Sequence, residues 1–407
     1  MKLVKLSLAT IIAMSSSVFG ADTLEDAFKN GSINGEARAF LFSRDYGNKS
    51  ANTDNDMLAV GLRLSYETEE LKGFRIGLGF QGQSTPWAST EAKADHQMAF
   101  DMGATGAVMS EAYLAYSMNK TDIKVGRQYF DKPLMISDNS RLIRQAIEGV
   151  TVVNTDIPDT TVYAAYAWAM QWMKGYDNEE FANFDDFGFV GPVGDYAYVV
   201  GAINKSVKDL DITLAYGVQD NSHSLLLAQA DYTPMIGDIK LVTGLQYWNT
   251  EIDGTGDVLW TDSTIYAAKL GVEVGPLSGY VAYADLQDGT GAWGVGMLDD
   301  RPRLYTSTIV DAGIYDASEQ FAINLQYVVM PMELVLGTRY VDIDVDENAI
   351  AKLALGGDET HIGGYAAKHF GSGALKGFTC VVIYEQLDSD TEINDKDELR
   401  VRLSYEF

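Results

Sequence analysis

The final segment of the chain, 398–407, carries the clearest pattern of apolar and polar positions. Every odd position from Leu399 to Phe407 is apolar, and every even position from Glu398 to Glu406 is polar. Successive side chains of a β-strand point to opposite faces, so this segment is predicted to form a strand with one apolar and one polar face. A helix of the same residues would mix charged and apolar side chains all round. The same period of two recurs along most of the chain.

This pattern predicts eighteen strands that are joined alternately by short turns and by long loops. The long loops include 82–107, 170–195 and 288–319, and the connection at 220–224 is the exception because it is brief. The strands are predicted at 33–42, 57–67, 73–81, 108–118, 121–126, 147–154, 159–169, 196–205, 210–219, 225–232, 238–248, 263–274, 277–287, 320–330, 332–343, 360–370, 374–386 and 398–407.

Alternation of apolar and polar side chains fits two architectures. In a soluble sandwich the apolar face is the core, whereas in an outer-membrane barrel it meets lipid and the polar face lines a wet lumen. Short turns at one end and long loops at the other favour the barrel, with the turns in the periplasm and the loops outside the cell. Every backbone polar group must be paired in lipid, so the last strand should pair with the first. The predicted fold is therefore all-β: a transmembrane antiparallel up-and-down β-barrel of about 18 strands, formed by 21–407 as one unit.

The first residues are predicted to be a cleaved signal peptide. Lys2 and Lys5 give a positive start, and the segment 6–21 carries no charge. Its apolar part ends at Ser15, too soon for a transmembrane helix, which needs roughly 20 apolar residues. The prediction therefore assigns 1–20 to the signal peptide and places the mature chain in the outer membrane of a Gram-negative bacterium.

Composition narrows the range of functions. The chain has 58 acidic and 30 basic residues, a net charge of −28 and 46% hydrophobic residues, which is too hydrophobic for a disordered acidic chain. The absence of a basic patch argues against a nucleic-acid partner. One cysteine, Cys380, excludes a disulfide framework, and four scattered histidines give no zinc pattern, so no cofactor is expected to be required. The acids, concentrated in loops, would favour cations at the pore mouth.

A barrel of this width is too wide for its own side chains to fill, so it is expected to hold an aqueous channel. Opposite charges on neighbouring strands would orient polar solutes, and rings of one sign would select ions. For each residue the alternative is a solvated lumen side chain that is paired across strands. The charged residues that strand alternation assigns to the pore lining are Arg38, Arg63, Arg75, Glu111, Lys124, Arg339, Arg400 and Arg402.

The segment 127–146, between the fifth and sixth strands, is the candidate constriction loop. It concentrates charged residues around turn-forming Lys-Pro and Ser-Asp-Asn-Ser sequences. A loop that folds inward would narrow the pore and its charges would set selectivity; the alternative is an outward surface loop, and spacing alone does not decide between them. The candidate constriction residues are Arg127, Asp131, Lys132, Asp138, Arg141, Arg144 and Glu148.

Parts of this segment resemble the OprD-type porin family. The resemblance rests on the Gly-Arg-Gln start at 126–128, Pro133, the Ser-Arg-Leu core at 140–142, Gln145 and the Glu-Gly-Val sequence at 148–150. It implies an eighteen-stranded, often trimeric porin whose loop after the fifth strand folds into the lumen. Carboxylate-specific relatives carry a ladder of lumen arginines, whereas the lumen bases here are matched by acids.

Two further stretches, 149–168 and 23–40, resemble the Campylobacter-type major outer-membrane porins. Relatives of this type can hold Ca²⁺ near the constriction, which makes Asp131 and Asp138 the nearest candidate calcium ligands. The last strand, which ends in Phe407, is similar to the terminal strand that the barrel-assembly machinery recognises. The resemblance therefore implies that machinery and a homotrimer as partners, besides the lipid bilayer and lipopolysaccharide.

The leading functional prediction is a porin, and not an enzyme, that lets small hydrophilic solutes and ions diffuse passively with a weak cation preference. One alternative is a substrate-specific channel of the same barrel type for carboxylates or amino acids. Others are an adhesin that acts through its surface loops and a lipid-hydrolysing barrel enzyme. The enzyme would need a nucleophile and a base. Ser222 precedes His223, but adjacent side chains on a strand point apart, which favours coincidence.

Overall fold

The computed structural model describes residues 20–48, 54–90, 92, 106–171, 182–183, 194–253, 262–287, 303–310, 317–346, 357–390, 392 and 394–407. The predicted signal peptide at 1–20 lies outside the described residues except for Gly20. No helix in the described part of the chain is long and apolar enough to cross a membrane.

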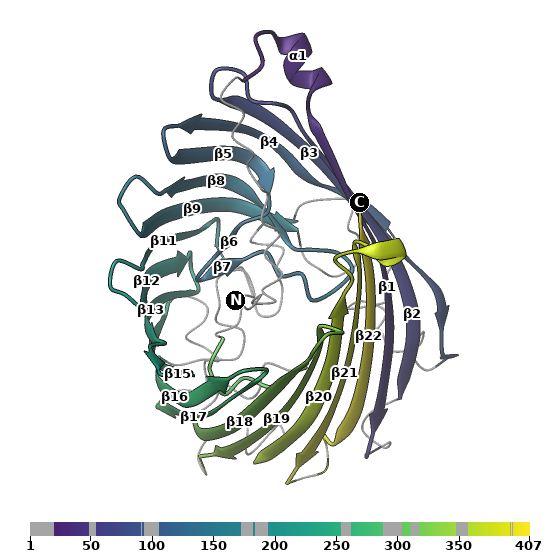
Figure 1. The fold of residues 1–407 in the computed structure, drawn as a ribbon, viewed down its shortest axis with the longest axis vertical. Coiled ribbons are helices and arrows are strands. Elements are labelled where there is room, and N and C mark those ends of the chain that lie inside the picture. The colour runs from purple at the N-terminus through teal and green to yellow at the C-terminus, as the bar shows by residue number, and fades with distance from the viewer. Residues whose placement is uncertain are drawn as a thin grey trace.

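Eighteen long antiparallel strands, counted over the described residues, form a single closed barrel (Figure 1). Consecutive long strands pair with each other, and β1 pairs with β22 to close the sheet. This confirms the predicted fold. The long strands are β1 (Ser32–Tyr46), β2 (Asn55–Glu67), β3 (Phe74–Ala88), β4 (Gly106–Met118), β5 (Thr121–Gln128), β8 (Ala146–Asn154), β9 (Thr160–Gln171), β11 (Ala197–Asn204), β12 (Leu210–Gln219), β13 (His223–Tyr232), β15 (Ile239–Ile252), β16 (Ser263–Val274), β17 (Leu277–Gln287), β18 (Ser318–Val329), β19 (Leu334–Val345), β20 (Glu359–His369), β21 (Phe378–Ser389) and β22 (Lys396–Glu406).

The remaining described elements are short. A helix, α1 (Leu24–Lys29), precedes β1 and begins where Thr23 Oγ1 accepts a hydrogen bond from the backbone N–H of Asp26 at 3.1 Å. The hydroxyl of Tyr66 donates to the carbonyl of Phe28 and attaches α1 to β2. The other short elements are β6 (Asp131–Lys132), β7 (Met135–Ile136), β10 (Ala182–Asn183), β14 (Met235–Ile236) and a 3-10 helix at Gly373–Leu375.

The two faces of the barrel wall follow from the period-two pattern. On β2, Val60, Leu62 and Leu64 are 39%, 46% and 39% exposed, whereas the intervening Arg63 side chain is 14% exposed. Side chains on the inner face are covered by neighbouring lumen residues and by loop segments, and side chains on the outer face have only the bilayer to cover them. The apolar face therefore meets hydrocarbon and the polar face lines the lumen.

Strand ends differ from the prediction more than strand positions do. Each predicted strand overlaps a long strand of the structure, but β1, β3 and β15 extend to Tyr46, Ala88 and Ile252, past their predicted ends at 42, 81 and 248. These extensions lie on the long-loop side, where the residues are mostly polar. The lipid no longer requires apolar side chains there, so the alternation that marks a strand in the sequence fades.

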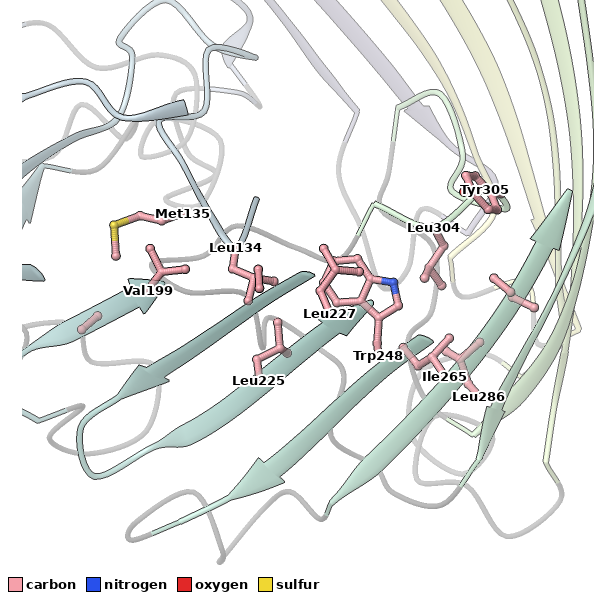
Figure 2. Close-up of a cluster of buried hydrophobic side chains, with 14 of the residues drawn as sticks. Leu134, Met135, Val199, Leu225, Leu227, Trp248, Ile265, Leu286, Leu304 and Tyr305 are labelled. Carbon is pink, nitrogen blue, oxygen red and sulfur yellow. The ribbon is translucent and has the colours of Figure 1, made fainter. Parts of the chain in front are cut away.

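Part of the lumen is filled by an apolar cluster rather than by water. Small and apolar side chains of the inner wall, from β8 round to β19, pack against residues of two loop segments that lie inside the barrel (Figure 2). The first segment, 129–145, contributes Leu134 and Met135, and the second, 303–310, contributes Leu304 and Tyr305. β6 and β7 of the first segment are visible inside the ring of strands (Figure 1).

Candidate pore constriction

The first inward segment, 129–145, is held against the wall that β8 and β9 form. Its β6–β7 hairpin is closed by two bonds between Phe130 and Ser137, one from each backbone N–H, at 2.9 and 2.7 Å. Met135 is 1% exposed in the apolar cluster, and the hydroxyl of Tyr163 on β9 donates to the carbonyl of Pro133 at 3.2 Å. Apolar burial therefore fixes one side of the segment.

Polar contacts hold the same segment against β1, β2 and β3. Arg38 Nη1 donates to Asn139 Oδ1 at 2.8 Å and to the Arg141 carbonyl at 3.0 Å. On β3, Gln81 Nε2 donates to the Arg144 carbonyl at 2.6 Å, and Arg144 N donates back to Gln81 Oε1 at 2.9 Å. The segment therefore contacts the inner wall at several strands between β1 and β9.

Several predicted pore-lining arginines gather beside this segment. Arg38 and Arg63 both pair with the carboxylate of Glu36, at 2.7 and 3.1 Å. Arg402 stacks its guanidinium 5.2 Å from the centre of the Phe40 ring. Arg400 pairs with a neighbouring carboxylate on its own strand. The structure therefore brings Arg38, Arg63, Arg400 and Arg402 of the predicted lining onto three adjoining strands, β1, β2 and β22.

Arg402 differs from its neighbours in its hydrogen bonding. Among the described residues its Nε atom is buried and has no hydrogen-bond partner. A buried polar N–H group without a partner is energetically costly, because burial removes the water that would otherwise accept its hydrogen bond. The Arg402 side chain therefore keeps a hydrogen-bond donor at Nε that the described residues leave unused.

The predicted constriction residues within the segment have internal partners. Arg144 pairs with the carboxylate of Asp131, and its Nε donates to the Ser137 carbonyl at 3.2 Å. Asp138 Oδ1 accepts a hydrogen bond from the backbone N–H of Ser140. Lys132 lies on β6, opposite Met135 of β7 in the backbone register. These contacts stabilise the conformation of the segment, whose charged side chains lie close to the arginines of the barrel wall.

Arg127 and Glu148 do not join this cluster, which differs from the expectation that they line a constriction. β5 continues to Gln128, so alternation places Arg127 on the outer face together with Val125, which is 46% exposed. Arg127 Nε pairs with Glu148 Oε2 at 2.8 Å, and Trp168 Nε1 donates to Glu148 Oε1 at 3.2 Å. The neighbour of Trp168, Ala167, points into the apolar cluster, which puts the Arg127–Glu148 pair outside the lumen.

The remaining predicted lining residues also lie on the inner wall, and Glu111 among them is within electrostatic reach of Arg63 and Arg144. Arg75 pairs with Glu67 at 3.0 Å and with Asp122, close to the short turns. On β5, Lys124 lies 4.5 Å from the centre of the Tyr113 ring. Glu111 on β4 packs over Gly79, where an added Cβ would come within 2.4 Å of its carboxylate. Arg339 lies on β19 and contacts the second inward segment.

The second inward segment, 303–310, was expected to be part of an outer loop. The backbone carbonyl of Arg303 accepts a hydrogen bond from Gln246 Nε2 at 3.0 Å, and the backbone N–H of Tyr305 donates to Gln246 Oε1 at 3.2 Å. Thr306 Oγ1 donates to Gln320 Oε1 at 2.7 Å, and Arg339 donates to the Tyr305 carbonyl at 2.8 Å. The apolar pair at 304–305 is the one local signal for this placement, and it is weak because long loops often contain such pairs.

Tyr305 is the central anchor of the second segment. Its hydroxyl donates to Asp231 Oδ1 at 2.9 Å, and Lys269 Nζ lies 4.0 Å from the centre of its ring. Burial, followed by the neighbouring Asp231 carboxylate, raises the pKa of Tyr305, so the phenol stays protonated and remains a donor. Asp231 also pairs with Lys269 at 2.6 Å, which completes a compact network on this wall.

The predicted calcium site lacks a set of ligands within the described part of the chain. No group of three or more His, Cys, Asp or Glu residues there lies close enough to hold a metal ion. Asp131 is paired with Arg144, and Ca²⁺ takes 6–8 oxygen ligands. Asp131 and Asp138 alone do not fit such an ion, so calcium binding stays a prediction that would require additional ligands.

Ser222 and His223 contact each other, contrary to the expectation from strand alternation. Ser222 precedes β13 in a turn, and its Oγ lies 2.8 Å from His223 Nδ1. The rule that adjacent side chains point apart applies only within a strand, which explains the difference. Both side chains are buried, 8% and 3% exposed, so this pair does not meet a lipid substrate at the barrel surface.

Comparison with solved structures finds the same barrel in other outer-membrane proteins. Pseudomonas aeruginosa OccK8 (OprE) is 16% identical with a TM-score of 0.77, over 94% of this chain and 99% of that chain. Acinetobacter baumannii OccAB3 is 16% identical with a TM-score of 0.77, over 93% and 99%. Pseudomonas aeruginosa OpdK, in its structure with vanillate, is 15% identical with a TM-score of 0.76, over 93% and 99%. At these identities the likeness establishes the fold alone.

No curated protein sequence matches the chain. A sequence profile described as "outer membrane porin, OprD family" matches residues 25–407, which is nearly the whole chain. Proteins of that family are channels of the Gram-negative outer membrane rather than enzymes. The match agrees with the closed barrel, the lipid-facing outer wall and the polar lumen described above. The chain therefore belongs to the OprD family of outer membrane porins.

Proposed function

We propose that this porin passes small hydrophilic solutes by passive diffusion and prefers solutes that carry a carboxylate group. The single observation that supports this preference most is Arg402 on the lumen wall, whose buried Nε atom has no hydrogen-bond partner among the described residues. A guanidinium recognises a carboxylate through two parallel hydrogen bonds, and this pairing is strongest where water is excluded. Nearby, Arg38 and Arg63 share one carboxylate, that of Glu36, so positive charge exceeds negative charge among these side chains.

We also propose that the first inward segment, which lies within 127–146, forms a constriction of the pore. Support comes from its contacts with two separate parts of the barrel wall, through Tyr163 on β9 and Arg38 on β1. A segment held at both places occupies part of the lumen and leaves a narrower path beside it. A solute on this path would pass the arginines of β1, β2 and β22.

The test compares wild-type protein with Arg402→Gln in planar bilayers. We expect the substitution to lower the permeability of vanillate relative to potassium by about tenfold, because a charged hydrogen bond is worth about 1.5–3 kcal/mol. Vanillate is a suitable probe because the structure of Pseudomonas aeruginosa OpdK contains it. Arg127→Gln is the matched control, since that arginine pairs with Glu148 on the outer face. An unchanged permeability ratio in Arg402→Gln would contradict the preference.

A second candidate, weak cation preference, is favoured by an acidic pocket at the outer ends of β19, β20 and β21. The pocket has a volume of about 410 Å³ and its charge would attract cations toward the pore mouth. Reversal potentials in a KCl gradient separate the two candidates, because their signs are opposite. The pocket is lined by Asp342, Ile343, Asp344, Asp358, Glu359, Thr360, Asp388, Ser389 and Asp390.

The proposed partners besides solutes and the bilayer are lipopolysaccharide, the barrel-assembly machinery and two further copies in a homotrimer. The exposed outer aromatic residues Tyr166 and Trp168 are suited to the interface between lipid chains and headgroups. The mass of the protein in detergent, measured by light scattering, tests the oligomeric state. A monomer mass would contradict the trimer and leave the channel proposal intact.

A further inference from the structure

We propose that Tyr129 is a positioning residue that holds the guanidinium groups of Arg63 and Arg144 side by side and so helps to set solute selectivity. The inference rests on the proposed carboxylate preference and extends it to a residue that neither the sequence pattern nor the resemblance singles out. Tyr129 lies directly after β5, at the start of the first inward segment.

The aromatic ring of Tyr129 contacts two cations. The Arg144 Cζ atom lies 4.2 Å from the ring centre and the Arg63 Cζ atom lies 5.7 Å from it. A cation within about 6 Å of an aromatic ring centre is attracted by the negative face of the ring. Arg63 belongs to the barrel wall and Arg144 belongs to the inward segment, so the ring joins a wall charge to a segment charge.

Other contacts restrain each arginine separately. Arg63 donates to Asn139 Oδ1 at 2.9 Å and pairs with Glu36 at 3.1 Å, and Arg144 pairs with Asp131. Two guanidinium groups close together repel each other, most strongly where water is scarce. The Tyr129 ring offsets this repulsion because it contacts both groups, whereas Glu36 and Asp131 each pair with one of them.

The ring acts as a neutral face rather than as a counter-ion. Burial raises the pKa of the Tyr129 phenol above its ordinary value, so the side chain carries no charge in the working pH range. A carboxylate at Arg63 or Arg144 would cancel part of their positive charge, as Glu36 and Asp131 already do. An aromatic side chain holds the cations in place and leaves their charge available to a passing anion.

The experiment measures the vanillate-to-potassium permeability ratio of wild-type protein, Tyr129→Phe, Tyr129→Leu and Tyr129→Met in planar bilayers. Phenylalanine keeps the ring, so we expect its ratio to stay within about twofold of wild type, whereas leucine and methionine should lower it about threefold to tenfold. Tyr166→Leu is the matched control, because Tyr166 lies on the outer face and is 45% exposed.

Three outcomes decide the inference. A lower ratio in Tyr129→Leu with a preserved ratio in Tyr129→Phe supports it. An unchanged ratio in folded Tyr129→Leu, or in Tyr129→Met if the leucine variant does not fold, overturns it. An equal loss in Tyr129→Phe also overturns it, because the hydroxyl and not the ring would then be responsible. Arg402→Gln separates this result from the proposed function: if that variant behaves like wild type, the carboxylate preference itself fails.

Discussion

At the scale of single residues, the free-energy cost of a charged side chain depends on whether it lies on the lipid-facing or the lumen-facing side of its strand. On β2, Leu62 points to the bilayer and is 46% exposed, and one position further along Arg63 sits in the lumen with paired oxygens. An arginine that faces the hydrocarbon loses its water of hydration and gains no ion-pair partner in return. An arginine that faces the lumen stays solvated by water or paired with a carboxylate.

Leu62→Arg should therefore destabilise the barrel by about 2–4 kcal/mol, the cost of an arginine near the bilayer midplane. Ser65→Arg is the control, because Ser65 lies on the inner face of the same strand. The measurement is the free energy of unfolding in lipid vesicles, from guanidinium titrations of tryptophan fluorescence. Equal losses in both variants would mean that the two faces of β2 are assigned the wrong way round.

Residue roles were predictable from the sequence where strand alternation applies and not where it stops. Arg38, Arg63 and Arg402 are assigned to the lumen by alternation, and the structure brings them together. The expectation for Arg127 rests on its place in a loop, whereas β5 continues to Gln128 and carries Arg127 on its outer face. Tyr129 gives no sequence signal, since its role depends on two arginines from distant parts of the chain.

At the scale of elements, the second inward segment depends on one buried carboxylate of β21. Glu385 is 4% exposed and accepts hydrogen bonds from the backbone N–H groups of Ile309 and Val310, at 2.7 and 3.3 Å. Its other close neighbour is His361 Nδ1 at 3.5 Å. This carboxylate fixes the end of 303–310 farthest from Tyr305, so the segment is held at two points.

Glu385→Ala should loosen the segment, because hydrogen bonds to a charged group are worth about 1.5–3 kcal/mol. We expect single-channel recordings to show more frequent transitions between conductance levels than in wild type. Glu385→Gln keeps one carbonyl acceptor, so its frequency of transitions should lie between those of wild type and Glu385→Ala. If the recordings of Glu385→Ala and wild type cannot be told apart, 303–310 is held without Glu385.

The strands were predictable because the pattern that marks a strand lies within its own sequence. The inward segments were only partly predictable, because their positions depend on contacts with distant residues. A strand in a bilayer needs alternating side chains within its own sequence, and each predicted strand overlaps an observed one. The segment 303–310 is held by Asp231, Gln246 and Gln320, which lie on three different strands. No local pattern encodes such contacts. Only the resemblance favours an inward fold for the first segment, and only the weak signal of the apolar pair at 304–305 indicates it for the second.

At the scale of the whole molecule, closure of the barrel depends on the meeting of its two ends. Gly35 and Phe407 exchange two backbone hydrogen bonds at 2.8 and 3.0 Å, and the Phe407 ring lies over Gly35, where an added Cβ would come within 2.2 Å of it. The ring covers the gap that a glycine leaves in a strand, a device known to stabilise sheets. The ends of the chain thereby form a seam.

Gly35→Val should weaken this seam by about 1–3 kcal/mol, because the added side chain displaces the Phe407 ring. The fraction of protein that migrates as the compact folded form in unheated electrophoresis measures the loss. Gly371→Val is the control, since nothing lies within 4 Å of a Cβ at that position. Closure does not depend on this contact if both variants fold as completely as wild type.

The most direct test of the account is single-channel recording of the purified, folded protein in planar bilayers. An OprD-family barrel with water beside its inward segments is predicted to give discrete and stable conductance steps. In a salt gradient these steps should reverse at a potential that reports preference for the anion. A folded barrel that inserts into the bilayer and carries no current would contradict the central claim.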